Sequence, residues 1–290
     1  MDALLHQIVS GLATGGIYGA LALALVMIYR ATHYINFVQG EMSMFSAFVA
    51  WTLIQGGLPF WLAGLLTIAI SFAGSAAIER LVIRRFKTAP YFTVVVVFIG
   101  LFVAFNSIAG WIWTYTTRSF PSLLPGEFLP RSSYASAHEI WMIAVVMVMV
   151  LVLYLFFRFT SLGLAMRATA QNPLSSRYVG IRVDRMIALG WGVSAAIGAV
   201  AGMLVAPIVY LDPNMMQGIL IYAFAAALLG GIESPFGAVV GGFIVGVVEN
   251  LLGAYLIGNE LKLTAAFLAI ILILLLRPSG LFGRPQTTRV

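Results

Sequence analysis

Hydrophobic residues run along this chain in long, nearly unbroken stretches, separated by short segments that hold most of the charged residues. An α-helix needs about 20 apolar residues to cross a bilayer, whereas the strands of a membrane β-barrel alternate apolar and polar positions. The pattern therefore predicts an all-α, polytopic membrane protein with about eight or nine transmembrane helices. The predicted spans are 7–29, 37–55, 59–79, 91–113, 140–158, 187–210, 217–232, 236–257 and 261–277.

Composition agrees with this fold class and excludes several kinds of chemistry. Of the 290 residues, 61% are hydrophobic and 9% are charged, compared with about 25% charged residues in a soluble domain. The chain has no cysteine, so it has no disulfide, no thiolate metal site and no cysteine nucleophile. His6, His33 and His138 are too far apart to suggest a metal site. The net charge of +6 does not point to nucleic acid here, because its placement along the spans matters more.

The distribution of basic residues predicts the orientation. With the N-terminus outside, 13 of the 16 Lys and Arg residues fall in inner loops, and only Arg118, Arg131 and Lys262 fall outside. Because cytoplasmic loops are enriched in Lys and Arg, we expect the N-terminus outside and the C-terminus in the cytoplasm. No basic residue precedes the first apolar run, so we expect that run to be a retained span and not a signal peptide.

We expect a single transmembrane domain over 1–290, with an outer loop near 114–139 and one long inner loop near 159–186. In the inner loop, Thr160 or Ser161 can cap a short helix that ends at Gln171. Asn172 can cap a second helix with Pro173 at its first position, Gly180 suits a left-handed C-terminal residue, and Asp184 can cap the sixth span. Two interpretations stay open: a basic loop that lies on anionic lipid, or an element that docks into a groove on a cytoplasmic partner.

Small residues recur at four-residue spacing in three spans. Gly11, Gly15 and Gly19 form such a ladder in the first span, and Ser194, Gly198 and Gly202 form one in the sixth. The eighth span contains Gly237–Gly241 and Gly242–Gly246. Ladders of this kind let helix backbones approach closely within a membrane. They predict either packing within this chain or a seam against a second membrane subunit.

Three stretches resemble one known family, in the same order and at matching distances. They are "NFVQGEM" (36–42), "LGLAMRATAQNPLSSRYVGIRVDRMIALGWGVSAAIGAVAGML" (162–204) and "LLGGIESPFGAVVGGFIVGVVENLL" (228–252). The chain resembles the permeases of branched-chain amino acid ABC importers over essentially its whole length. The resemblance implies an importer in a bacterial inner membrane, with a second, homologous permease, two cytoplasmic ATPase subunits and a periplasmic solute-binding protein.

The resemblance also assigns candidate residues for contact with the ATPase subunits. The positions that match the coupling motif of the family are Gly163, Arg167, Ala168, Gln171, Asn172 and Gly180. The chain departs from the family after its Asn-Pro pair, where Arg177 and Tyr178 replace residues that are usually small. The family further implies leucine, isoleucine, valine or a close relative as the substrate, with urea, short amides or other small carboxylates as the alternative.

No catalytic machinery is evident in the sequence. The chain lacks a GxxxxGK[ST] phosphate loop, so we expect it to bind no cofactor itself, with ATP and Mg²⁺ used by partner subunits. We therefore expect a non-catalytic subunit. A secondary transporter or channel is the alternative class, but such proteins usually carry a relay of carboxylates or histidines at mid-membrane depth, and none is visible.

Polar residues near the start of the second span are candidates for the substrate pathway or a gate. Asn36 can cap this helix, with Gln39 at the third position reaching back as in a capping box. Glu41 lies deeper than capping requires, and we interpret it as part of an inner gate or cavity floor. Glu249 and Asn250, about 13 residues into the eighth span, are the other candidates. A charge at that depth needs a partner or a wet cavity, unless it reaches the outer interface.

Overall fold

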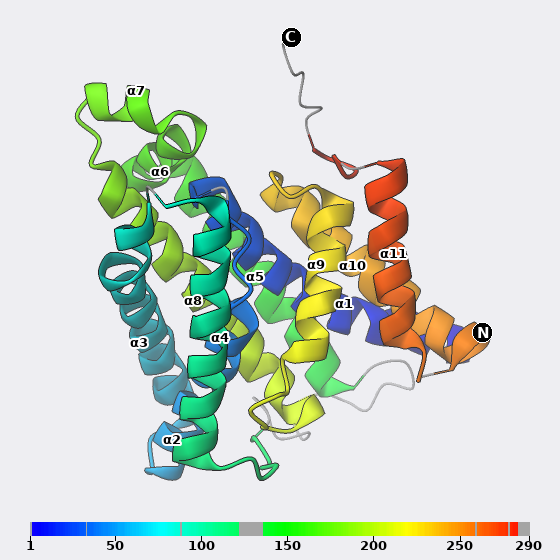
Figure 1. Ribbon diagram of the computed structural model, residues 1–290. Helices are drawn as coiled ribbons and strands as arrows, with labels where there is room; N and C mark the ends of the chain where they lie inside the picture. Colours follow the sequence, from blue (N-terminus) through cyan, green and yellow to red (C-terminus); the bar gives the residue numbers. More distant parts are fainter. Residues whose placement is uncertain are drawn as a thin grey trace. The chain divides into compact units, whose positions relative to one another are not determined.

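The computed structural model describes residues 2–32, 34–87, 89–121, 136–258, 260–277 and 279–283. These residues are almost entirely helical, and the single pair with strand-like hydrogen bonding among them is Arg118 with Leu211. Most of the predicted outer loop 114–139 lies outside the described residues. The helices in chain order (Figure 1) are α1 (Asp2–Thr32), α2 (Gln39–Gln55), α3 (Phe60–Leu81), η1 (Ile83–Phe86), α4 (Tyr91–Trp113), α5 (Ala137–Phe159), α6 (Ser161–Gln171), α7 (Pro173–Tyr178), α8 (Val183–Val209), α9 (Gln217–Gly230), α10 (Pro235–Leu252), η2 (Gly253–Ile257) and α11 (Lys262–Leu276).

Each of the nine predicted spans coincides with one apolar helix. Six of these helices, α1, α3, α4, α5, α8 and α10, are long and apolar enough to cross a membrane. The other three are shorter, with 17 residues in α2, 14 in α9 and 15 in α11. The chain is thus a polytopic, all-α membrane protein, as its pattern of apolar residues predicts.

The chain divides into two compact units. Unit 1 comprises residues 1–26, 121–147 and 217–290, and unit 2 comprises residues 27–120 and 148–216. The expectation of one permease domain over 1–290 remains a prediction.

Unit 1 is built on close contacts between glycine-rich helix faces. A Cβ atom on Gly15 of α1 would lie 2.7 Å from the carbonyl oxygen of Gly242, and one on Gly246 would lie 2.3 Å from the Cα of Gly15. On another face of α10, a Cβ on Gly241 would lie 2.2 Å from the carbonyl oxygen of Ala226 in α9. The ladders of α1 and α10 therefore pack within this chain, which confirms the first of the two interpretations for these helices.

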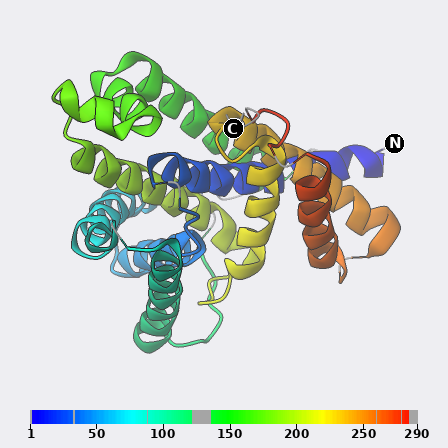
Figure 2. The same cartoon turned by 45° about the horizontal axis from the view of Figure 1, so that its top comes forward.

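Helices α9, α10 and α11 lie beside one another in unit 1 (yellow to red in Figures 1 and 2). Ser234 caps α10 by accepting a hydrogen bond from the amide of Gly237 at 3.0 Å, with Pro235 at the first helical position. The residue after α9, Gly231, has a φ of +104°, a conformation that favours glycine. The segment 231–234 is thus a tight turn that joins α9 to α10.

Unit 2 is centred on α8, which packs against α2 and α3. The second ladder faces α2, because a Cβ atom on Gly202 would lie 2.3 Å from the carbonyl oxygen of Ser43. Trp191 of α8 is fully buried at the centre, 6.0 Å from the ring of Phe98. The carbonyl of Trp191 accepts a hydrogen bond from Ser75 of α3 at 2.9 Å.

The outward surfaces of the spanning helices are apolar. Large side chains such as Leu65 on α3, Phe92 and Trp111 on α4, and Leu151 on α5 are mostly exposed. In water such a surface would be unfavourable, but for a helix of membrane-spanning length it is the surface expected to face lipid tails.

Candidate functional site

The loop between α5 and α8 folds into two short capped helices. The Thr160 hydroxyl accepts a hydrogen bond from the amide of Gly163 at 3.0 Å and so caps α6. The side-chain oxygen of Asn172 accepts a hydrogen bond from the backbone amide of Ser175 at 2.9 Å and so caps α7. Pro173 is the first residue of α7. Gly180 follows α7 with a φ of +84°. The predicted caps and the left-handed glycine are confirmed.

One face of α6 packs against its own unit. Gly163, Met166 and Thr169 are buried on this face. A Cβ atom on Gly163 would lie 2.4 Å from the carbonyl oxygen of Phe156, so only glycine lets α6 approach the end of α5 this closely. Of the remaining coupling candidates, Arg167 and Ala168 are half-buried, and the exposed ones are Gln171, Asn172 and Gly180.

The opposite side of the loop exposes large apolar side chains. Tyr178 is 83% exposed and Val179 is 77% exposed, while Leu164 and Leu174 are each 60% exposed. Sequence reasoning did not single out this set for docking. Two features of the sequence could have indicated these exposed side chains. Leu164 is out of phase with the buried positions of α6, and Tyr178 and Val179 directly precede the left-handed Gly180. An exposed apolar patch on a short, firmly capped element is typical of a protein contact.

Charged residues gather where α3 ends, where α8 begins and at the end of α7. The ribbon of these elements is drawn in Figure 1. Asp184 pairs with Lys87 and, at 3.9 Å, with Arg177. Arg84 contacts Glu79 at 2.7 Å and donates a second hydrogen bond to the backbone carbonyl of Asp184 at 3.0 Å. The prediction that Asp184 caps α8 is wrong. The helix α8 begins at Val183, after Arg182. The Asp184 carboxylate instead forms ion pairs with Lys87 and Arg177.

Asn36 and Gln39 lie together, but they do not form a capping box. The side-chain oxygen Oδ1 of Asn36 accepts a hydrogen bond from the backbone amide of Val38 at 3.1 Å, and α2 begins only at Gln39. Gln39 is the first and not the third helical residue, and its side-chain oxygen accepts from the side-chain amide of Asn36 at 3.5 Å without capping the helix. Gln39 also bonds to Ser194 of α8, with its amide donating to the backbone carbonyl at 3.2 Å and its oxygen accepting from the hydroxyl at 2.9 Å.

Glu41 lies apart from that pair and is almost fully buried, with 1% of the residue exposed. The neighbour bonded to its carboxylate is Asn106 of α4, whose amide nitrogen is 3.4 Å from Oε2. Among the described residues no ion pair involves Glu41, in contrast to Glu79 and Asp184. A carboxylate kept in such surroundings is costly, and within membrane-spanning helices it is typical of a functional position.

Glu249 and Asn250 belong to unit 1. The Glu249 carboxylate pairs with Lys262, the first residue of α11, at 3.2 Å and accepts a hydrogen bond from the Tyr18 hydroxyl at 3.2 Å. The Asn250 amide donates to the backbone and side-chain oxygens of Gln7, both at 2.8 Å. Glu249 thus has the partner that its depth requires, which sequence reasoning left unnamed.

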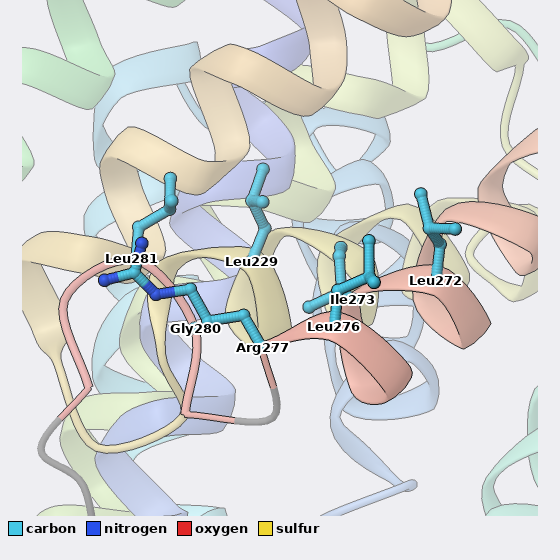
Figure 3. A pocket seen from close by; sticks show the side chains of 7 residues that line it. All are labelled: Leu229, Leu272, Ile273, Leu276, Arg277, Gly280 and Leu281. Carbon is cyan, nitrogen blue, oxygen red and sulfur yellow. The ribbon is translucent and has the colours of Figure 1, made fainter.

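Unit 1 also contains an apolar pocket of about 180 Å³ between α9, α11 and the segment that follows α11 (Figure 3). Its walls are leucine and isoleucine side chains, and its one charged lining residue is Arg277. The following segment is held in place by hydrogen bonds from the amides of Leu281 and Phe282 to the carbonyls of Leu229 and Gly230, at 2.7 and 3.1 Å. The lining offers no acceptor side chain for an amino acid's ammonium.

Comparison with known proteins identifies the family. Residues 7–276 match the family described as the permease component of the branched-chain amino acid transport system. The chain belongs to this family. The permease is 31% identical to the high-affinity branched-chain amino acid transport system permease protein LivH of Escherichia coli, over 99% of this chain and 97% of that protein. It is 33% identical to BraD of Pseudomonas aeruginosa, a permease protein of the same description, over 99% and 98% of the two chains.

Among solved structures, the permease resembles PsaBC from Streptococcus pneumoniae in complex with Fab. The TM-score is 0.52 at 12% sequence identity, with 93% of this chain and 91% of that chain covered. At this identity the likeness concerns the fold alone.

Proposed function

We propose that this permease is the membrane subunit of an ABC importer that moves branched-chain or related amino acids inward. The observation that carries this proposal is the family match over 7–276, together with about one-third identity to LivH and BraD along whole chains. The chain itself is non-catalytic in this proposal. ATP and Mg²⁺ are bound by two cytoplasmic ATPase subunits, and a periplasmic binding protein delivers the amino acid. A second, homologous permease completes the path through the inner membrane.

The α6–α7 element is the proposed contact with the ATPase subunits. Its inward face packs against the end of α5 at Gly163, and Arg177 lies 3.9 Å from Asp184 at the start of α8, so a force on the loop is transmitted to α5 and α8. Its exposed face presents Leu174, Tyr178 and Val179. The bend between α6 and α7 contains Gln171 and Asn172, and Gly180 follows α7 in a left-handed conformation. Arg167 and Ala168 lie on α6 before the bend. In this proposal the six sequence-based coupling candidates act partly as contacts and partly as positioning residues.

Tyr178→Ala tests both the partner and the place of contact. The tagged chain is purified from membranes of its own host, and Mg²⁺-dependent ATP hydrolysis of the purified material is measured. We expect hydrolysis to accompany the unaltered chain and to fall at least about fivefold in Tyr178→Ala, because large exposed aromatics contribute strongly to interfaces.

The matched control is Tyr255→Ala, which removes a tyrosine that is 56% exposed in unit 1. It should retain the hydrolysis of the unaltered chain. Absence of ATP hydrolysis from the unaltered preparation would contradict the ABC assignment. Equal losses in both variants would contradict only the placement of the contact on α7.

A further inference from the structure

Three oxygen atoms converge on one nitrogen beside the buried carboxylate of Glu41. The side-chain nitrogen of Asn106 lies 3.0 Å from the carbonyl oxygen of Pro213, 3.2 Å from Oδ1 of Asn214 and 3.4 Å from Oε2 of Glu41. All four residues belong to unit 2. The Tyr115 hydroxyl donates to Oδ1 of Asn106 at 3.2 Å, which fixes the end of the amide that faces these oxygens.

This arrangement offers more acceptors than the amide can use. A primary amide carries two N–H bonds, so it can satisfy two of the three oxygens at a time. The oxygen at the greatest distance belongs to the Glu41 carboxyl group, although hydrogen bonds to an ionised carboxylate are normally the shorter and stronger ones. The nitrogen that these three oxygens approach therefore carries two N–H bonds and no positive charge.

A protonated primary amine supplies what the cluster lacks. It carries three N–H bonds and a unit positive charge at one nitrogen, as a lysine side chain does. Placed where the Asn106 nitrogen lies, it would face one carboxylate and two neutral oxygens. A carboxylate held without a cation inside a membrane-spanning bundle is expensive, and binding a cationic group there recovers part of that cost.

The oxygens are held in place by the surrounding backbone. Arg118 and Leu211 exchange backbone hydrogen bonds of 2.9 Å, which join the segment after α4 to the segment after α8. The Asp212 carboxylate accepts from the amide of Asn214 at 2.8 Å and fixes the turn that follows. The cluster extends from buried Glu41 to exposed Asn214, so one end of it lies at the surface.

We propose that Glu41, Pro213 and Asn214 form a binding site for the ammonium group of the transported amino acid, with the Asn106 amide as the group that the ammonium replaces. The inference rests on the proposed function for the identity of the ligand. It assigns to Glu41 a direct contact with substrate. The Asn106 amide contacts the three oxygens when no ammonium is bound, and Tyr115 is a positioning residue that holds this amide.

The test measures binding of radiolabelled leucine to the complete transporter complex in lipid nanodiscs, without the binding protein. Isopentylamine, which keeps the ammonium and lacks the carboxylate, should compete with leucine. The carboxylate analogue 4-methylpentanoate should compete poorly. In Glu41→Gln we expect the Kd for leucine to rise about 10- to 100-fold and competition by isopentylamine to disappear, because a charged hydrogen bond is lost.

Two further variants separate this role from a structural one. Glu139→Gln is the matched control, since Glu139 caps the start of α5 through Ser136 and lies in unit 1. Its Kd should equal that of the unaltered complex. Tyr115→Phe removes the hydroxyl that holds the Asn106 amide, so leucine should bind more tightly. A purely structural role for Glu41 would lower the number of sites and leave the Kd and the competitor profile unchanged, which would overturn the proposal.

Where the Kd lies beyond the range of the binding assay, the same variants are compared in proteoliposomes by leucine transported per ATP hydrolysed. Glu41→Gln should lower this ratio, and Glu139→Gln should not. An unchanged ratio in Glu41→Gln, with ATP-driven leucine uptake intact, overturns the ammonium site and leaves the importer function standing. Competition between Na⁺ and leucine in binding would likewise overturn it in favour of a metal-cation site. Loss of ATP-driven uptake from the unaltered complex would instead contradict the proposed function.

Discussion

Two carboxylates in the membrane-spanning helices have different partners. Glu249 is paired with Lys262, and their side chains are 12% and 20% exposed, so each charge compensates the other within one unit. Glu41 has the neutral Asn106 amide in the corresponding place. A paired carboxylate is stabilised in the resting protein, whereas an unpaired one is available to a cationic ligand. This difference separates a structural pair in unit 1 from the proposed site in unit 2.

Lys262→Met tests the structural role of the first pair. The substitution leaves Glu249 mostly buried with the Tyr18 hydroxyl as its remaining partner, and we expect a loss of about 3 kcal/mol in the free energy of unfolding in detergent. Adding Glu249→Gln to Lys262→Met should restore part of the loss, because no unpaired charge remains. The measurement is the thermal midpoint of the purified chain by size-exclusion chromatography. A double variant less stable than Lys262→Met would contradict an ion pair at this place.

Individual helices owe their contacts to small residues more than to large ones. In unit 1 the α1–α10 contact has glycine facing glycine, and in unit 2 the Gln39 side chain lies on the glycine face of α8. Close backbone approach gains dispersion contacts where lipid tails offer no hydrophobic driving force. A substitution at such a glycine therefore acts on a pair of helices, not on one residue.

Gly15→Leu should separate α1 from α10. A Cβ atom at Gly15 already meets α10 at 2.7 Å, and the larger side chain should lower stability by about 1–3 kcal/mol or more. The matched control is Gly74→Leu on α3, where a Cβ meets no atom within 4 Å. That variant should be neutral or slightly stabilising, because leucine favours helix more than glycine does. The thermal midpoints of both variants test this, and equal destabilisation would contradict the specific contact.

Elements fixed by local contacts were predictable from sequence, and those fixed by distant contacts were not. The caps at Thr160 and Asn172 bond to amides three residues along, so the local order of residues suffices to find them. The partners of Gln39 and Glu41 are 155 and 65 residues away. Amphipathic spacing says nothing about which distant helix a buried polar side chain will meet. For this reason the sequence predicts a local capping box for Gln39 and does not indicate the contact between Asn106 and Glu41.

At the scale of the whole molecule, charge placement predicts one orientation. In unit 2, Arg84, Lys87 and Arg177 gather with Asp184 where α3 ends and α8 begins. Arg118 instead lies over the ring of Trp51 near the ends of α2 and α4, 4.5 Å from its centroid. By the positive-inside rule we expect this basic cluster, and the α6–α7 element with it, on the cytoplasmic side.

The absence of cysteine makes this orientation directly measurable. Ser175→Cys places a thiol on exposed α7, and Thr116→Cys places one in the segment after α4. In intact spheroplasts a membrane-impermeant maleimide should label Thr116→Cys at once. Ser175→Cys should be labelled only after permeabilisation. The reverse pattern would contradict the assignment of α6–α7 to the cytoplasm.

The measurement that bears most directly on the central claim is uptake of radiolabelled leucine into proteoliposomes. These contain the permease, its homologous partner, the ATPase subunits and external binding protein, with all ion gradients dissipated. We expect leucine to accumulate when ATP is enclosed and not when ADP is enclosed, with uptake lost when the binding protein is omitted. Uptake at equal rates with ATP and ADP, or by this chain alone down a leucine gradient, would contradict an ATP-driven importer.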